Sequence, residues 1–201
     1  MANASIHFEI IPGVTSAIAA PAYAGIPLTH RGYASSVTVV TGTQEPGNSD
    51  NTIPWKQLSQ IKGTIAVLMG WNKLTSIVSN LRDNGLEADT PVAIIECGTQ
   101  PHQRTVVGTL TDIVQRSKEA RINPPIVTVI GNVVSLRGEI RWFDNRPLFG
   151  KRVMVTRSLS QVSVLSELLS TEGAQPLEVP TIEIRPLDNY NHLDNALSTL
   201  S

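Results

Sequence analysis

The sequence predicts an α/β fold in which helices cover the faces of a β-sheet. Three short runs of apolar and β-branched residues are each closed by a glycine, as buried strands often are: residues 64–69, 91–96 and 125–130. Between the first two runs, apolar residues recur at the spacing of one helix face, at Leu74, Ile77, Val78 and Leu81. Strands that alternate with helices in this way are typical of α/β sandwiches.

The first quarter of the chain is expected to add two strands and a helix. Residues 8–11 form an apolar run that Pro12-Gly13 ends, which predicts a strand followed by a turn. Thr15 or Ser16 can cap the helix that begins there. Alanines at five positions of this helix allow it to approach the sheet closely. Residues 37–41 are β-branched and predict the next strand, and the polar residues 43–52 predict a surface loop.

The middle of the chain predicts further elements around the three buried runs. Residues 55–61 can form a short helix, and residues 103–110 form a strand that can pair with residues 91–96. Thr111 is expected to cap a helix from Asp112 to about Arg121. Residues 133–142 then form a short tail.

A second unit is predicted after the polar stretch of residues 144–150. Residues 151–157 start a new strand, and residues 161–172 form a helix that Gly173 ends. A second strand is expected over residues 181–185, and a last helix starts at His192. We therefore expect one domain over residues 1–144 and a partial domain over residues 145–201.

The composition excludes several classes of function. Of the 201 residues, 41% are hydrophobic and 16% charged, and the formal net charge is −1. The chain therefore lacks the basic field of a nucleic-acid-binding protein. No stretch reaches the ~18 apolar residues of a membrane span. The four histidines are scattered without the spacing of metal ligands, so no metal site is expected.

Cys97 is the single cysteine of the sequence, so it cannot form an internal disulfide. This usage fits a reducing, cytoplasmic compartment. A catalytic thiol would need a nearby base, for which His102 is the one close candidate in sequence. We favour a buried strand end as the interpretation of Cys97.

Residues 10–42 join a strand end, a Pro-Gly turn, a small-residue helix and a Pro-Leu-Thr-His-Arg loop in one order. This run resembles the middle of uroporphyrinogen-III C-methyltransferases, which are tetrapyrrole methylases, and the resemblance extends from about Phe8 to Phe143. It implies the carboxy-terminal domain of that fold, with a mixed sheet and flanking helices. It also implies S-adenosylmethionine as cofactor and methylation of uroporphyrinogen III to precorrin-2, in siroheme or cobalamin biosynthesis.

The resemblance implies which residues line the cofactor cleft. Thr15 and Ser16 match a pair that contacts the cofactor, Met69 matches a methionine at a strand end, and Gly98 matches a glycine whose backbone approaches the ligand. Residues 125–126 match a further contact on the adenosine side. Each residue type also has an ordinary structural use: the cap of a helix, the filling of a core or a turn.

Two loops of the family do not occur in this sequence, Gly-Pro-Gly-Asp-Pro and Gly-Gly-Asp-Pro. In the family they belong to the amino-terminal domain, together with the residues proposed for proton transfer. We therefore expect the chain to lack that catalytic half, and we assign no catalytic residue.

Residues 148–201 carry a second resemblance, to the amino-terminal edge of uroporphyrinogen-III synthase. It rests on Gly-Lys-Arg-Val-Met-Val-Thr-Arg, Leu-Leu-Ser-Thr-Glu-Gly-Ala and Val-Pro-Thr-Ile-Glu-Ile. This segment is shorter than the ~100 residues of a typical domain. The order of the two resemblances predicts a methyltransferase fused to a synthase.

The family also implies partners. Uroporphyrinogen III carries eight carboxylates, so His30, Arg31 and Arg104 are candidates for binding them or, equally, for salt bridges. A homodimer is expected from the resemblance. Two alternatives stay open: a non-catalytic module that binds a tetrapyrrole, a partner or a second copy, and another corrin or diphthine-type methylase of the same fold.

Overall fold

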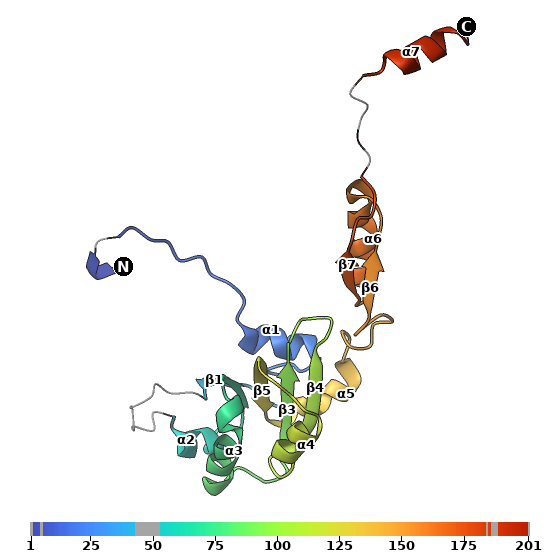
Figure 1. The fold of residues 1–201 in the computed structure, drawn as a ribbon. Coiled ribbons are helices and arrows are strands. Elements are labelled where there is room, and N and C mark those ends of the chain that lie inside the picture. The colour runs from blue at the N-terminus through green and yellow to red at the C-terminus, as the bar shows by residue number, and fades with distance from the viewer. Residues whose placement is uncertain (1, 5, 43–52, 184, 186–188, 201) are drawn as a thin grey trace.

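A mixed five-stranded sheet forms the centre of the larger part of the molecule (Figure 1). The computed structural model describes residues 2–4, 6–42, 53–183, 185 and 189–200. The strand order is β1-β2-β5-β3-β4. The strands are β1 (Val37–Thr41), β2 (Thr64–Leu68), β3 (Pro91–Glu96), β4 (Arg104–Thr109) and β5 (Ile126–Ile130). β1 and β2 are parallel, whereas β5 is antiparallel to β2 and β3, and β4 is antiparallel to β3.

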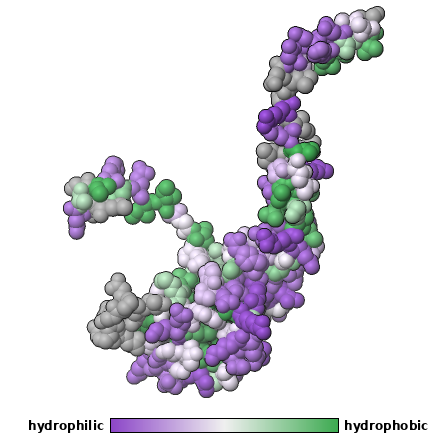
Figure 2. Space-filling model, in the orientation of Figure 1, coloured by the Kyte–Doolittle hydropathy of each residue, from purple (hydrophilic) through white to green (hydrophobic). Residues whose placement is uncertain are grey.

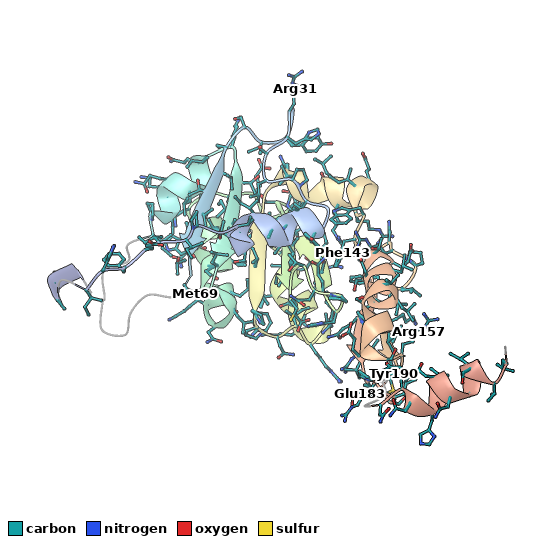
Figure 3. All side chains as sticks on the ribbon, turned by 90° about the horizontal axis from the view of Figure 1, so that it is seen from above. Arg31, Met69, Phe143, Arg157, Glu183 and Tyr190 are labelled. Carbon is teal, nitrogen blue, oxygen red and sulfur yellow. The ribbon has the colours of Figure 1, made fainter. Side chains whose placement is uncertain are left out.

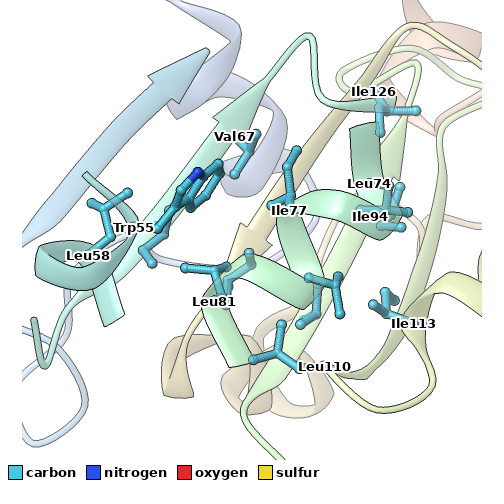
Figure 4. Packing of buried hydrophobic residues seen from close by; sticks show 14 of the residues in the cluster. Trp55, Leu58, Val67, Leu74, Ile77, Leu81, Ile94, Leu110, Ile113 and Ile126 are labelled. Atoms are coloured by element: carbon cyan, nitrogen blue, oxygen red, sulfur yellow. The ribbon is translucent and has the colours of Figure 1, made fainter. Parts of the chain in front are cut away.

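One face of the sheet is covered by three helices, and the main core lies between these helices and the sheet (Figure 4). These helices are α2 (Trp55–Gln60), α3 (Leu74–Asp83) and α4 (Ile113–Glu119). Val92 and Ile94 of β3 face this core, together with the apolar side of α3. Alternate residues of the strand and residues three or four positions apart in the helix therefore pack together in one cluster.

The opposite face is covered by α1 (Ser16–Tyr23) and by the 3-10 helix η3 (Asn132–Leu136), and α5 (Arg137–Ile140) follows η3 and contacts it. Ala20 and Ala24 pack there against Ala93 and Ile95 of β3. Small side chains on both elements let α1 lie close to the sheet. The predicted mixed sheet with flanking helices is confirmed.

The second part contains a two-stranded parallel sheet with one crossing helix (Figure 1). It consists of β6 (Arg152–Val155), α6 (Leu159–Thr171) and β7 (Gln175–Glu178), and α7 (Asn191–Ser198) follows. The expected strand over residues 181–185 is wrong for the described residues 181–183 and 185, which are not in a strand. The strand lies earlier because Arg152 pairs with Gln175 and Val155 with Glu178.

The amino-terminal segment also departs from expectation. Residues 6–15 contain no helix, strand or turn, so the strand predicted over residues 8–11 and the turn at Pro12-Gly13 are wrong. Ile10 is 83% exposed and Ile11 is 89% exposed, because none of the described strands lies beside them. Figure 2 shows this arm extending from the rest of the molecule, with hydrophobic and hydrophilic residues along it. A short 3-10 helix, η1 (Ala2–Ala4), precedes it.

Other local expectations have mixed outcomes. The loop predicted over residues 43–52 lies outside the described residues. The predicted cap of α4 is wrong, because the Thr111 hydroxyl donates to the carbonyl of Ala88 and Asp112 is the N-cap residue. The 3-10 helix η2 (Trp71–Lys73) leads into α3. None of the helices in the described ranges is long and apolar enough to cross a membrane.

We expect Asp112 to make the free energy of unfolding depend on pH in the acid range. The backbone amide of Thr109 and then the guanidinium of Arg116 lower the pKa of Asp112 from its ordinary value of 3.8. A lowered folded-state pKa gives stabilisation that is present above the ordinary pKa and is lost as the pH falls through the lowered value. The gap in unfolding free energy between the natural chain and Asp112→Asn should therefore be larger at about pH 6 than at about pH 3. Urea unfolding at both pH values measures it, and a constant gap contradicts the assignment.

Candidate functional site

Several chain segments meet at one edge of the sheet. Because β2 and β3 are both antiparallel to β5, their carboxyl ends lie at the same edge as its amino end. Leu68 pairs with Val127 and Glu96 pairs with Ile126. The residues that follow β2 and β3 therefore flank the start of β5. In α/β proteins, loops that leave a sheet edge in this way commonly form ligand sites.

The backbone at this edge adopts costly conformations. Among the described residues, four that are not glycine have positive φ, and three of them lie here: Met69 (51°), Cys97 (48°) and Thr99 (75°). Such conformations cost about 1–3 kcal/mol each and persist where surrounding contacts impose them. The Cys97 amide donates to the carbonyl of Pro125 over 3.0 Å, which fixes the turn after β3 to the start of β5.

A pocket of about 370 Å³ lies between the start of α1, the loop after β3 and the start of β5. Ser16, Gly98 and residues 125–126 line it, as expected from the sequence. Its remaining lining residues, which were not predicted as cofactor contacts, are Val14, Ala19, Ala20, Ile95, Cys97, Thr99, Gln100 and Val127. The volume falls in the range of small-molecule sites.

Two of the predicted residues do not line the pocket. Thr15 caps α1, because its hydroxyl oxygen accepts a hydrogen bond from the amide of Ala17 over 3.3 Å. Met69 follows β2 at the same edge but is 64% exposed and lies outside the pocket (Figure 3). The structure thus brings Ser16 and Gly98 together, with Thr15 directly beside them and Met69 farther along the edge.

Gly98 is required by a close contact between the loop and α1. A Cβ atom on Gly98 would lie 2.4 Å from the Cβ of Ala20 and 2.9 Å from its Cα. Contacts this short do not occur between real side chains, so only glycine fits against the helix here. The two walls of the pocket therefore touch each other at Gly98 and Ala20.

Gln103 is a structural residue of the site that the sequence analysis missed. It is only 3% exposed, its side-chain oxygen accepts from the amide of Thr99 over 2.9 Å, and its nitrogen donates to the carbonyl of Tyr23 over 3.3 Å. Gln103 thereby links the loop to the end of α1. Nothing local marks it, because its partner in α1 lies 80 residues away in the sequence.

A model of the tetrapyrrole (corrin/porphyrin) methylases matches residues 1–114. The chain belongs to this family. We call residues 6–140 the methylase part of the chain below.

Curated relatives agree with this family. The chain is 40% identical over 196 residues to the porphyrin biosynthesis protein HemD of Ruminiclostridium josui. These residues are 98% of the chain and 39% of that protein. The chain is 47% identical over 131 residues to the S-adenosyl-L-methionine-dependent uroporphyrinogen III methyltransferase of Methanosarcina barkeri, covering 65% of the chain and 51% of the relative. The chain therefore spans about two fifths to one half of these relatives.

A solved structure is similar to about two thirds of the chain. It is the uroporphyrin-III C-methyltransferase of Thermus thermophilus in complex with S-adenosylhomocysteine. The TM-score is 0.57 at 27% identity, and the match covers 67% of this chain and 57% of the other.

The surroundings of Cys97 do not activate its thiol as a nucleophile. Its partial burial, and secondarily the carboxylate of Glu96, raise the pKa of the thiol above its ordinary value. The neutral thiol therefore predominates at neutral pH. Cys97 directly follows the end of β3, as expected from the sequence, but it is half-buried and not buried. Among the described residues, no group of three or more histidine, cysteine, aspartate or glutamate side chains could hold a metal ion.

Arg104 forms a salt bridge within the chain, which is one of the two roles expected for it from the sequence. Its guanidinium forms a salt bridge of 3.1 Å with Glu96 and donates to the carbonyls of Ala120 and Arg121. The amide of Asn123 donates to the same carboxylate over 3.1 Å. These contacts hold the segment after α4 against β3 and use part of the donor capacity of the Arg104 guanidinium.

His30 and Arg31 lie at the opposite edge of the sheet. Their loop precedes β1, and with Lys62 it lines an open depression of about 670 Å³. Figure 3 shows Arg31 at the tip of this loop, pointing away from the molecule. Within one chain these cations therefore do not approach the pocket at Ser16 and Gly98.

Proposed function

We propose that the chain supplies one wall of the S-adenosylmethionine site of a uroporphyrinogen-III C-methyltransferase. The observation that carries the proposal is the pocket itself, in which Ser16, Gly98 and residues 125–126 converge from three separate segments. These are positions at which the resemblance to the family implies cofactor contacts. The named cofactor of the Methanosarcina relative and the ligand of the Thermus structure support the same assignment.

The lining residues suit the adenosine end of such a cofactor. Val14 and residues 125–126 offer apolar surface for a flat ring, and the Ser16 hydroxyl can hydrogen-bond a polar group. When bound, S-adenosylmethionine supplies an electrophilic methyl group. The reaction needs no protein nucleophile, so these residues would bind and orient the reactants and exclude water. A protonated Cys97 would not compete with the acceptor for the methyl group.

We extend the proposal to the whole protein. We infer that residues 1–144 are a methylase domain, that residues 145–201 begin a uroporphyrinogen-III synthase domain, and that the protein acts in siroheme or cobalamin biosynthesis. Relatives named for porphyrin biosynthesis and siroheme synthesis support this pathway. A cytoplasmic homodimer is part of the same proposal, and so is a role for Thr15 and Met69 beside the cofactor.

Calorimetric titration with S-adenosylhomocysteine tests the proposed site. We expect a dissociation constant near the micromolar range, about −8 kcal/mol. Ala19→Leu should abolish binding, because leucine is compatible with a helix but fills the pocket that Ala19 lines. Ala196→Leu, on the exposed face of α7, is the matched control and should bind like the natural chain.

The outcomes separate the candidate functions. If the natural chain and the control give heat of binding and Ala19→Leu gives none, the result supports the site. An assay of methyl transfer to uroporphyrinogen III is then justified. A folded natural chain that gives no heat would contradict the site and favour the non-catalytic module.

Met69 is tested separately, because it lies at the edge outside the pocket. If it flanks the cofactor, Met69→Ala should weaken binding of S-adenosylhomocysteine about tenfold, which corresponds to about 1.4 kcal/mol. Exposed Met154 of β6 provides the matched control as Met154→Ala. Unchanged binding in Met69→Ala would remove Met69 from the proposed contacts and leave the pocket residues in place.

A further inference from the structure

The end of α1 is held by side chains from distant parts of the sequence. The carbonyls of residues 22–24 accept hydrogen bonds from Trp142 (3.0 Å), Gln103 (3.3 Å) and Arg137 in turn. The last carbonyls of a helix have no partners within the helix, so such donors fix its end. Because α1 is a short helix, fixing its end also positions Ser16 and Ala19 at the pocket.

Residues 142–150 form an aromatic connector between the methylase part and the second part. The ring of Tyr23 in α1 lies 5.1 Å from that of Trp142 and 4.8 Å from that of Phe143, measured between centroids. Phe149 lies 5.4 Å from Phe143, and the Arg146 guanidinium lies 4.8 Å from the Trp142 ring centroid. These ring and cation contacts stabilise the connector against α1.

The aromatic connector also holds the loop after β3. The amide of Gly150 donates to the carbonyl of Pro101 over 3.0 Å. A second cavity of about 380 Å³ lies between this loop, the connector and the second part, and Thr99 and Gln100 line both cavities. Residues 97–103 are therefore a shared wall, with the candidate cofactor pocket on one side and the connector on the other.

The second part is joined to the connector through its own backbone. The amide of Leu148 in the connector donates to the carbonyl of Glu172 in the second part over 2.9 Å. Gly173 packs so closely that a Cβ atom there would lie 2.9 Å from the Cβ of Arg146. A shift of the second part would therefore move the connector.

We propose that the aromatic connector positions both walls of the pocket, so that the docking of residues 151–178 sets the affinity of the methylase part for S-adenosylmethionine. The affinity statement rests on the proposed function, whereas the positioning of the loop does not. Packed side chains and hydrogen bonds can carry energetic coupling between two places, and the connector provides such contacts between the second part and the pocket.

The test compares two arginines of the full chain. Arg146→Ala removes the guanidinium that lies over the rings of Trp142 and Phe143. Arg157→Ala removes an exposed arginine of the second part (Figure 3), which has no cation–π contact within the described residues. Phe149→Leu is a second variant that keeps an apolar side chain at the ring contact. For each variant, hydrogen exchange is measured over residues 98–104 and 17–25, and S-adenosylhomocysteine binding by calorimetry.

We expect Arg146→Ala and Phe149→Leu to exchange faster in both segments and to bind about fivefold more weakly, and Arg157→Ala to match the natural chain. Unchanged exchange in both connector variants would overturn the proposal, whether or not the ligand binds. Faster exchange with unchanged affinity would overturn the coupling to the pocket. Faster exchange in both connector variants, together with a natural chain that does not bind the ligand, would support the positioning role and contradict the proposed function instead.

Discussion

Replacing Gly98 with alanine is expected to separate the two walls of the pocket and to weaken binding of the proposed cofactor. The new Cβ atom would lie 2.4 Å from the Cβ of Ala20, so either the loop or α1 must move. Overpacking of this kind lowers the free energy of unfolding by about 1–3 kcal/mol. Displacement of one wall should weaken S-adenosylhomocysteine binding at least tenfold, which corresponds to about 1.4 kcal/mol. Urea unfolding and calorimetry measure the two effects.

Two further variants control this prediction. Gly138→Ala places a methyl group in open space in α5, where alanine favours the helix, so stability should stay the same or rise slightly. Ala20→Gly removes the nearest clashing atom, and in combination with Gly98→Ala it should recover part of the lost binding. Full binding in Gly98→Ala alone would show that the contact between the walls is not needed.

The second large effect is expected at the ion pair of Arg137 and Asp144. Their side chains are only 11% and 16% exposed, and Arg137 also donates to the carbonyl of Ala24. Asp144→Ala leaves a guanidinium without its counter-ion in a largely buried place, and loss of one partner of such a pair costs about 3–5 kcal/mol. Urea unfolding measures the loss.

The exposed ion pair between Arg185 and Glu183 is the matched control, with side chains 77% and 62% exposed. Glu183→Ala should change stability by at most about 1 kcal/mol, because solvent already screens that pair. A double variant, Arg137→Met with Asp144→Leu, should lose less than Asp144→Ala, since it leaves no uncompensated charge. Equal losses for Asp144→Ala and Glu183→Ala would show that burial of the pair does not matter.

The regular elements of the methylase part follow from local patterns. Residues 91–96 read as a strand and form β3 without a change of bounds, and the four apolar positions of α3 all face the core. Glycines mark where these elements end. Such signals lie within a few residues of each other, so the sequence alone is enough to detect them.

Two strand predictions failed because a strand also needs a partner. Residues 8–11 have the composition of a strand, but none of the described strands pairs with them. In the second part, β6 pairs with residues 175–178 although Pro176 cannot donate a ladder hydrogen bond. The sequence instead predicts the second strand over residues 181–185. Pairing between segments decides such cases, and composition does not record it.

For the candidate site, the sequence by itself determined the family and the loop after β3 that carries Gly98, whereas the need for glycine at that position comes from its packing against Ala20 in the tertiary structure. Only the tertiary structure decided that Ser16 lines the pocket while Thr15 caps the helix, that Arg104 is bound to Glu96, and that distant side chains hold the end of α1. The donors to residues 22–24 lie 80 to 120 positions away along the chain. Contacts over such separations depend on the packing of the whole sheet, so no local pattern of residues can predict them.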